Sequence, residues 1–164
     1  MSVAWGVEVD RAGETGAVAE ARPAAAGLWR VDLVFYQAAV TLPGWLAERY
    51  EIEPESAGVF CDPMPCAPVL DDLRRAVGLH TLEAVDVAAA SAQFKTAVKS
   101  RTVTAGEHPA LEQAVTYALQ RSLATAFAYE RRKVAADMSP LNAAAFALWG
   151  LRQHGESDPG AWVI

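Results

Sequence analysis

The apolar residues of this chain follow one repeat in the first 36 positions and another afterwards. Apolar side chains recur at every second position in residues 3–9, 17–22 and 28–36, which predicts three strands. A Gly-containing turn at residues 11–16 separates the first two, so we expect them to pair antiparallel. In the third segment Trp29, Val31, Leu33 and Phe35 alternate, and they are expected on one face. A chain that begins in this way has to build a sheet.

The rest of the sequence alternates strand patterns with helix patterns. Strands are expected at residues 59–62 and 82–85, and helices at 43–50, 68–77, 87–99 and from 109 onward. A final helix is expected to have Ser139 as its cap and Pro140 at its first position. Together these patterns predict an α/β fold, with a mixed sheet flanked by helices. Because no linker or internal repeat interrupts them, residues 1–164 are expected to form one domain with a loosely ordered tail from about residue 153.

The composition narrows the class of protein. Hydrophobic residues make up 52% of the chain and charged residues 21%, which is ordinary for a globular domain. No apolar run approaches the ~20 residues that span a bilayer, and the N-terminus lacks a signal-peptide pattern. Cys61 and Cys66 are too few for a disulfide framework, so we expect a cytoplasmic compartment and no membrane partner. The net charge of −6 argues against a basic coat protein for nucleic acid.

Carboxylates stand at three places that an apolar core would not favour. Glu8 and Asp10 share one face of the first strand, Asp62 ends a buried strand, and Asp137 precedes the final helix. Open α/β sheets bind ligands at the carboxyl ends of their strands, and hard cations such as Mg²⁺ bind carboxylate oxygens. The acids therefore predict a divalent-metal site that hydrolyses a phosphodiester. The structural alternatives are a helix cap at Asp137, a turn residue at Asp62, and a hairpin start at Glu8 and Asp10.

Basic residues gather in the second half of the chain, which carries a slight positive charge while the first half is acidic. The two clusters consist of Lys95, Lys99 and Arg101, and of Arg131, Arg132 and Lys133. A basic rim beside acidic ligands would let DNA phosphates approach, whereas the alternative is a solvated charged loop. Among the histidines, His108 is retained as an accessory candidate, and His80 and His154 are expected at the surface without matched partners.

Several other chemistries are excluded by their missing motifs. The sequence contains no GxSxG, no HExxH and no GxGxxG segment. It also contains no GxxxxGK[ST] loop, so it is not expected to bind ATP as a P-loop motor does.

Five short segments resemble the nuclease domain of tailed-phage terminase large subunits in their order and spacing. They are residues 5–9 (WGVEV), 59–63 (VFCDP), 106–111 (GEHPAL), 127–132 (FAYERR) and 137–150, which begins DMSPLNAA and ends LWG. The resemblance covers residues 2–152 and implies a ribonuclease-H-like fold. It further implies that two Mg²⁺ or Mn²⁺ ions are bound and that concatemeric double-stranded DNA is cut during genome packaging.

Carried over to this sequence, the resemblance assigns Asp62 and Asp137 as metal ligands and catalytic residues. Glu8 stands where the family usually has Asp, so either Glu8 or Asp10 completes the set. The implied partners are DNA, a terminase ATPase domain, the small subunit and the portal, in the cytoplasm of a bacterial host. The ATPase motor that precedes this domain in the complete family protein is not found in the chain. An excised domain, a separately encoded nuclease and a prophage remnant all remain open.

Two further functions fit the same pattern. One is a degenerate nuclease domain that docks onto DNA or the packaging machine without cutting. The other is a different ribonuclease-H-like enzyme, such as a junction resolvase.

Overall fold

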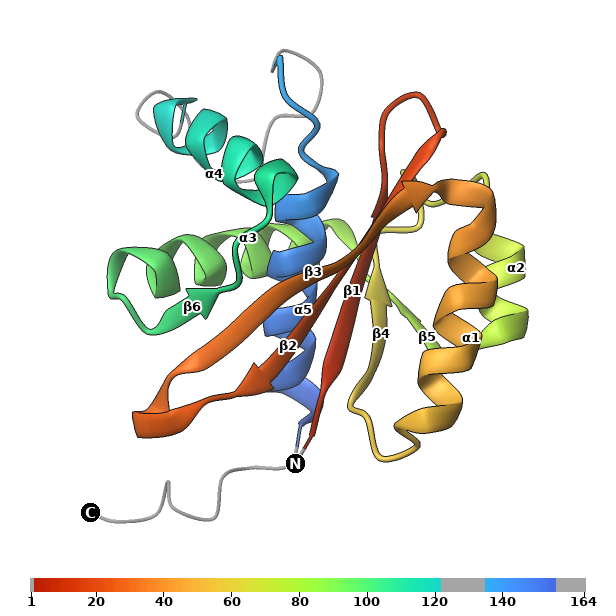
Figure 1. The fold of residues 1–164 in the computed structure, drawn as a ribbon, viewed down its shortest axis with the longest axis horizontal. Helices are drawn as coiled ribbons and strands as arrows, with labels where there is room; N and C mark the ends of the chain where they lie inside the picture. Colours follow the sequence, from red (N-terminus) through yellow and green to blue (C-terminus); the bar gives the residue numbers. More distant parts are fainter. Residues whose placement is uncertain (1, 122–134, 156–164) are drawn as a thin grey trace.

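A mixed β-sheet forms the centre of the fold (Figure 1). The computed structural model describes residues 2–121 and 135–155, and within them the sheet has six strands in the order β5-β4-β1-β2-β3-β6. The strands are β1 (Ala4–Val9), β2 (Thr15–Pro23), β3 (Trp29–Ala38), β4 (Gly58–Cys61), β5 (Leu79–Thr81) and β6 (Val103–Ala105). β2 is antiparallel to β1 and β3, whereas β4 is parallel to β1 and β5, and β6 is parallel to β3. The mixed sheet expected from the sequence is confirmed.

Helices cover both faces of the sheet, each over its own hydrophobic cluster. The helices α1 (Leu42–Ile52) and α2 (Leu70–Ala76) lie on one face, and α3 (Ala84–Lys99), α4 (Pro109–Arg121) and α5 (Ser139–His154) lie on the other (Figure 1). Two short 3-10 turns, η1 (Ala25–Gly27) and η2 (Ala39–Thr41), flank β3. No helix in the described ranges is both long and apolar enough to cross a membrane.

The region around residue 82 differs from expectation. Residues 82–85 were expected as a strand, but β5 ends at Thr81 and α3 begins at Ala84. A capping box is the reason, because the Glu83 and Asp86 side chains each accept a hydrogen bond from the other residue's backbone N–H. β6 was not expected at all, since three residues are too few to show a repeat.

The ends of α5 also differ in detail. Met138 occupies the N-cap position, and Ser139 is the first helical residue rather than the cap. The helix runs to His154 with Gly155 as its C-cap, so residues 153 and 154, which were expected in the tail, are helical. Residues 156–164 and 122–134 lie outside the described part of the chain, and the strand or extended loop that the sequence suggests over residues 122–129 falls in the second of these segments.

A β-bulge in the centre of the sheet changes which face the end of β3 presents. Val18 pairs with Phe35 while Ala19 pairs with Leu33, so Val34 is the extra residue. Leu33 belongs to the cluster under α3–α5, but Phe35 belongs to the cluster under α1 and α2. The expectation that the alternating residues of this strand share one face is therefore wrong beyond the bulge.

α5 is the most enclosed helix among those described. All its residues from Ser139 to Leu148 are buried, between the sheet on one side and α3 and α4 on the other. Small residues allow this close packing: a Cβ added to Gly6 of β1 would lie 2.5 Å from the backbone nitrogen of Ala147. The helix start is thereby held directly against the central strands.

Candidate functional site

The segments that carry the predicted ligands Glu8, Asp62 and Asp137 lie at one end of the sheet, where β1 and β4 finish and α5 begins (Figure 1). β1 and β4 are parallel, and their last paired residues are Val7 and Cys61. Glu8 follows Val7 in β1, and Asp62 directly follows Cys61 at the end of β4. The backbones of Glu8 and Asp62 therefore lie opposite each other, one residue beyond the last pair. Asp137 lies two residues before the start of α5. This is the carboxyl edge of the parallel pair, where open α/β sheets bind ligands.

Glu8 is a buried carboxylate. Only 1% of the residue is exposed, on the sheet face that α5 covers. The Asn142 side-chain amide, in the first turns of α5, donates a hydrogen bond from Nδ2 to Glu8 Oε2 over 2.5 Å. A carboxylate removed from water requires such a donor, so the start of α5 holds Glu8 in place.

Asp137 is held by three donors. The Tyr36 hydroxyl of β3 donates to Asp137 Oδ2 over 2.8 Å, and the Ser139 hydroxyl donates to the same oxygen over 2.9 Å. The Ser139 backbone N–H donates to Oδ1 over 2.9 Å. Burial and the Asp137 carboxylate raise the pKa of Tyr36 well above its usual value. Tyr36 therefore stays a protonated donor throughout the neutral range.

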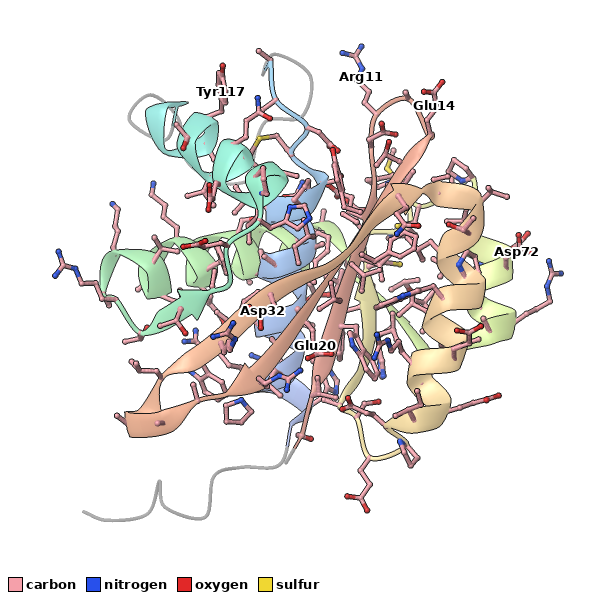
Figure 2. All side chains as sticks on the ribbon, in the orientation of Figure 1. Arg11, Glu14, Glu20, Asp32, Asp72 and Tyr117 are labelled. Atoms are coloured by element: carbon pink, nitrogen blue, oxygen red, sulfur yellow. The ribbon has the colours of Figure 1, made fainter. Side chains whose placement is uncertain are left out.

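Asp62 and Asp10 both have local structural contacts. Asp62 is half-buried, and its Oδ1 accepts the Met64 backbone N–H over 3.1 Å, which is a turn contact directly after β4. Asp10 Oδ1 accepts the backbone N–H groups of Glu14 at 2.8 Å and Thr15 at 3.1 Å. Asp10 thus stabilises the β1–β2 hairpin, whose loop carries Arg11 and Glu14 in Figure 2.

The donor set suits a hard divalent cation chemically, because it consists of carboxylate oxygens on three separate elements. Within residues 2–121 and 135–155, no three His, Cys, Asp or Glu side chains converge closely enough to hold an ion as they stand. Glu8 and Asp137 are nevertheless attached to the same helix start, through Asn142 and Ser139.

The basic residues lie apart from this edge or outside the described residues. Lys95 is half-buried and Lys99 and Arg101 are exposed, at the end of α3 and in the turn before β6. In the sheet, β6 is separated from β1 by β2 and β3. The second basic cluster, residues 131–133, lies in the part of the chain that the structure does not describe.

His108 is brought to the edge of the site. Its Nδ1 accepts the Ala110 backbone N–H over 3.2 Å, which helps to begin α4. Its ring meets the Tyr36 ring edge-on, with the centroids 6.0 Å apart. Sequence reasoning retained His108 but missed Tyr36, because a tyrosine at the end of a strand carries no motif.

Comparison with known proteins identifies the fold. No protein-family model matches the sequence, and no curated protein matches it. The crystal structure of the HK97 bacteriophage large terminase matches 91% of this chain with a TM-score of 0.65 and 12% identity. The chain spans 40% of that terminase. Thermus thermophilus RuvC matches 94% of this chain and 97% of its own length, with a TM-score of 0.42 and 13% identity.

These similarities concern the shape of the chain rather than its sequence. The order of strands, with an antiparallel start followed by parallel additions and helices on both faces, is the arrangement that the sequence resemblance implied. The chain has a ribonuclease-H-like fold, and its likeness to a phage large terminase is confirmed at the level of that fold.

Proposed function

We propose that this chain is the metal-dependent endonuclease domain of a phage or prophage terminase large subunit, which cleaves concatemeric double-stranded DNA during packaging. The observation that carries the proposal is the level placement of Glu8 and Asp62 on parallel neighbours, beside the helix start that follows Asp137. Three carboxylates at the carboxyl edge of a ribonuclease-H-like sheet suit phosphodiester hydrolysis. Residues 1–164 would act as one domain beside an ATPase domain.

The chain's own residues would hold and orient the reacting groups. When bound, two Mg²⁺ or Mn²⁺ ions would activate a water and stabilise the leaving oxygen of the phosphodiester. Glu8, Asp62 and Asp137 would be the ligands, with Asn142 holding Glu8 and with Tyr36 and Ser139 holding Asp137. The N-terminus of α5 adds a partial positive charge that favours the carboxylates gathered there.

The partners follow from the same proposal. DNA would approach the carboxyl edge of the sheet, with the basic residues of 131–133 or of the α3 end contacting its phosphates. The ATPase domain, the small subunit and the portal would be the protein partners, in the cytoplasm of a bacterial host. His108 would act beside the site rather than on an ion, because its Nδ1 already accepts a backbone N–H.

Plasmid cleavage tests the proposal directly. We expect the protein to convert supercoiled plasmid to linear DNA in Mn²⁺ or Mg²⁺ and to be inactive in EDTA. Asp62→Asn and Asp137→Asn keep the side-chain shape but remove the charge, and each is expected to lower the rate by about 100-fold or more.

Asp72→Asn provides the matched control. Asp72 lies on the outer side of α2, away from the site, and forms an exposed ion pair with Arg75 (Figure 2). Its substitution is expected to leave cleavage unchanged. Cleavage that survives in both Asp62→Asn and Asp137→Asn would rule out the assigned site.

A non-catalytic docking domain is the second candidate, and the burial of Glu8 favours it. A carboxylate that is 1% exposed offers almost no surface at which an ion could approach it. Mn²⁺ titration separates the two functions, because an ion that binds the folded state raises the melting temperature. A docking domain would show no such rise and no cleavage, whereas preference for four-way junctions over linear duplex would favour a resolvase.

A further inference from the structure

The hydroxyl of one strand residue reaches the carboxylate that precedes α5. Tyr36 stands at the end of β3, and its hydroxyl lies 2.8 Å from Asp137 Oδ2, across 101 positions of sequence. We propose that Tyr36 is a positioning residue of the site, which fixes the Asp137 carboxylate for ion binding through Oδ1. This inference rests on the proposed nuclease function and adds a residue that the sequence resemblance does not assign.

The number of hydrogen bonds that each Asp137 oxygen accepts indicates which oxygen would bind an ion. A carboxylate offers about four lone-pair directions, two on each oxygen. Oδ2 accepts from the Tyr36 hydroxyl and from the Ser139 hydroxyl, while Oδ1 accepts the Ser139 backbone N–H. Counting donors from the described residues 2–121 and 135–155 only, Oδ2 accepts two and Oδ1 accepts one, so the remaining lone-pair direction is on Oδ1. Tyr36 and Ser139 together also oppose rotation of the carboxylate.

The β-bulge brings Tyr36 to this position. In a regular strand Phe35 would share the face of Leu33, and Tyr36 would point to the opposite face. Because Val34 is inserted, Phe35 points to the α1–α2 face and Tyr36 to the α5 face. Bulges next to functional sites commonly aim a side chain in this way. The bulge therefore has a consequence at the site as well as in the core.

Two neighbours hold Tyr36 in place: the Asp137 carboxylate contacts its hydroxyl, and the His108 ring packs against its ring. The two rings meet edge-on, at an interplanar angle of 84°.

Tyr36→Phe tests the role, since it removes the hydroxyl and keeps the ring against His108. Mn²⁺ binding is measured by isothermal titration calorimetry, and plasmid cleavage is measured as a function of Mn²⁺ concentration. Loss of a residue that orients a metal ligand typically weakens metal affinity about 10–100-fold, and we expect a loss of this size. Cleavage should recover at high Mn²⁺, because the ligand itself remains.

Tyr50→Phe is the matched control. Tyr50 packs against Trp5 on the opposite face of the sheet, with the ring centroids 6.3 Å apart, and its change should alter neither Mn²⁺ affinity nor cleavage. Circular dichroism and melting of the ion-free proteins verify folding. If Tyr36→Phe did not fold, Tyr36→Met would remove the same hydroxyl with a flexible apolar side chain.

The outcomes distinguish the positioning role of Tyr36 from the proposed nuclease function. If the unchanged protein binds Mn²⁺ and cuts DNA but Tyr36→Phe has the same Mn²⁺ affinity, the positioning role is overturned and the nuclease function stands. If the unchanged protein neither binds Mn²⁺ nor cuts DNA, the proposed function fails, and the role of Tyr36 in it fails as well.

Discussion

At the scale of single residues, Glu8 depends on a partner from a distant part of the chain. It lies buried, and its Oε2 accepts a hydrogen bond from Asn142 Nδ2. Hydrogen bonds to charged groups stabilise folded proteins more than hydrogen bonds between neutral groups do. If the donor to a buried charge is removed, no water molecule can take its place. The pair therefore contributes to stability as well as to the geometry of the site.

Asn142→Ala is expected to lower the free energy of unfolding by about 1–3 kcal/mol, since the amide donor to a buried carboxylate is lost. Urea denaturation in EDTA measures this without any contribution from metal. Gln153→Ala, at an exposed position of the same helix, is the control and should change stability by less than about 0.5 kcal/mol. Equal stabilities of the two variants would contradict a structural role for the Glu8–Asn142 bond.

At the scale of secondary structure, the fit of α5 against β1 depends on a glycine. A Cβ on Gly6 would overlap the carbonyl oxygen of Ala143 and lie 2.5 Å from the nitrogen of Ala147. Both contacts are with helix backbone, so a flexible side chain cannot move aside to make room. The helix would have to shift away from the strand that carries Glu8.

Gly6→Ala is therefore expected to destabilise the protein by about 1–3 kcal/mol or more, as overpacking does. Gly44→Ala is the matched control, because no atom lies within 4 Å of the added Cβ there. Alanine is the better helix former by about 1 kcal/mol, so this change within α1 should leave the stability equal or higher. Chemical denaturation of both variants checks the contrast, and a Gly6→Ala protein as stable as the original would refute the tight packing.

The bulge of β3 is the second feature at this scale. Val34 is the inserted residue, and it moves Phe35 to one face and Tyr36 to the other. The same strand thus packs against α1 and α2 on one side and reaches Asp137 on the other. With an unbroken ladder Phe35 would share the face of Leu33 and Tyr36 would lie on the α1–α2 face, because side chains alternate along a regular strand.

At the scale of the whole molecule, α5 connects the candidate site to the opposite end of the sheet. Its last residue, His154, packs against His80 of β5 with the ring centroids 5.0 Å apart. Phe60 of β4 lies against both rings, stacked on His80 at 4.8 Å. Both histidines are exposed, as expected, and their ring contact is an addition that the sequence did not indicate.

This cluster predicts a pH dependence of stability. Burial lowers the pKa of His80, and repulsion from His154 lowers it further. As pH falls through about 6.5, the unfolded chain binds protons that the folded state binds less readily, so stability decreases. We expect the urea concentration at the midpoint of unfolding to be lower at pH 5.5 than at pH 7.5.

His80→Gln isolates this contribution, because acids elsewhere also respond to pH. The variant should lose less stability over the same interval than the unchanged protein. Because His80 is exposed at the surface, the difference is expected to be small but of fixed sign. A variant that loses as much stability as the unchanged protein would contradict the prediction.

Local patterns in the sequence were sufficient for most of the elements and for the acids as candidates. The repeats in residues 3–9 and 17–22 correctly predict β1 and β2, and Pro140 correctly marks the start of α5. These features depend on neighbours within a few positions. The mixed sheet follows from them because antiparallel strands can be joined by short turns, whereas parallel ones need crossovers.

Contacts between distant residues decided the rest. The bond between Tyr36 and Asp137 and the bond between Glu8 and Asn142 join segments 101 and 134 positions apart. The bulge at Val34 arises in the pairing of β3 with β2. Sequence alone determined that carboxylates would stand at strand ends and before a helix. Only the tertiary structure decided which side chains hold them, because a hydrogen bond across the fold depends on packing rather than on any local repeat.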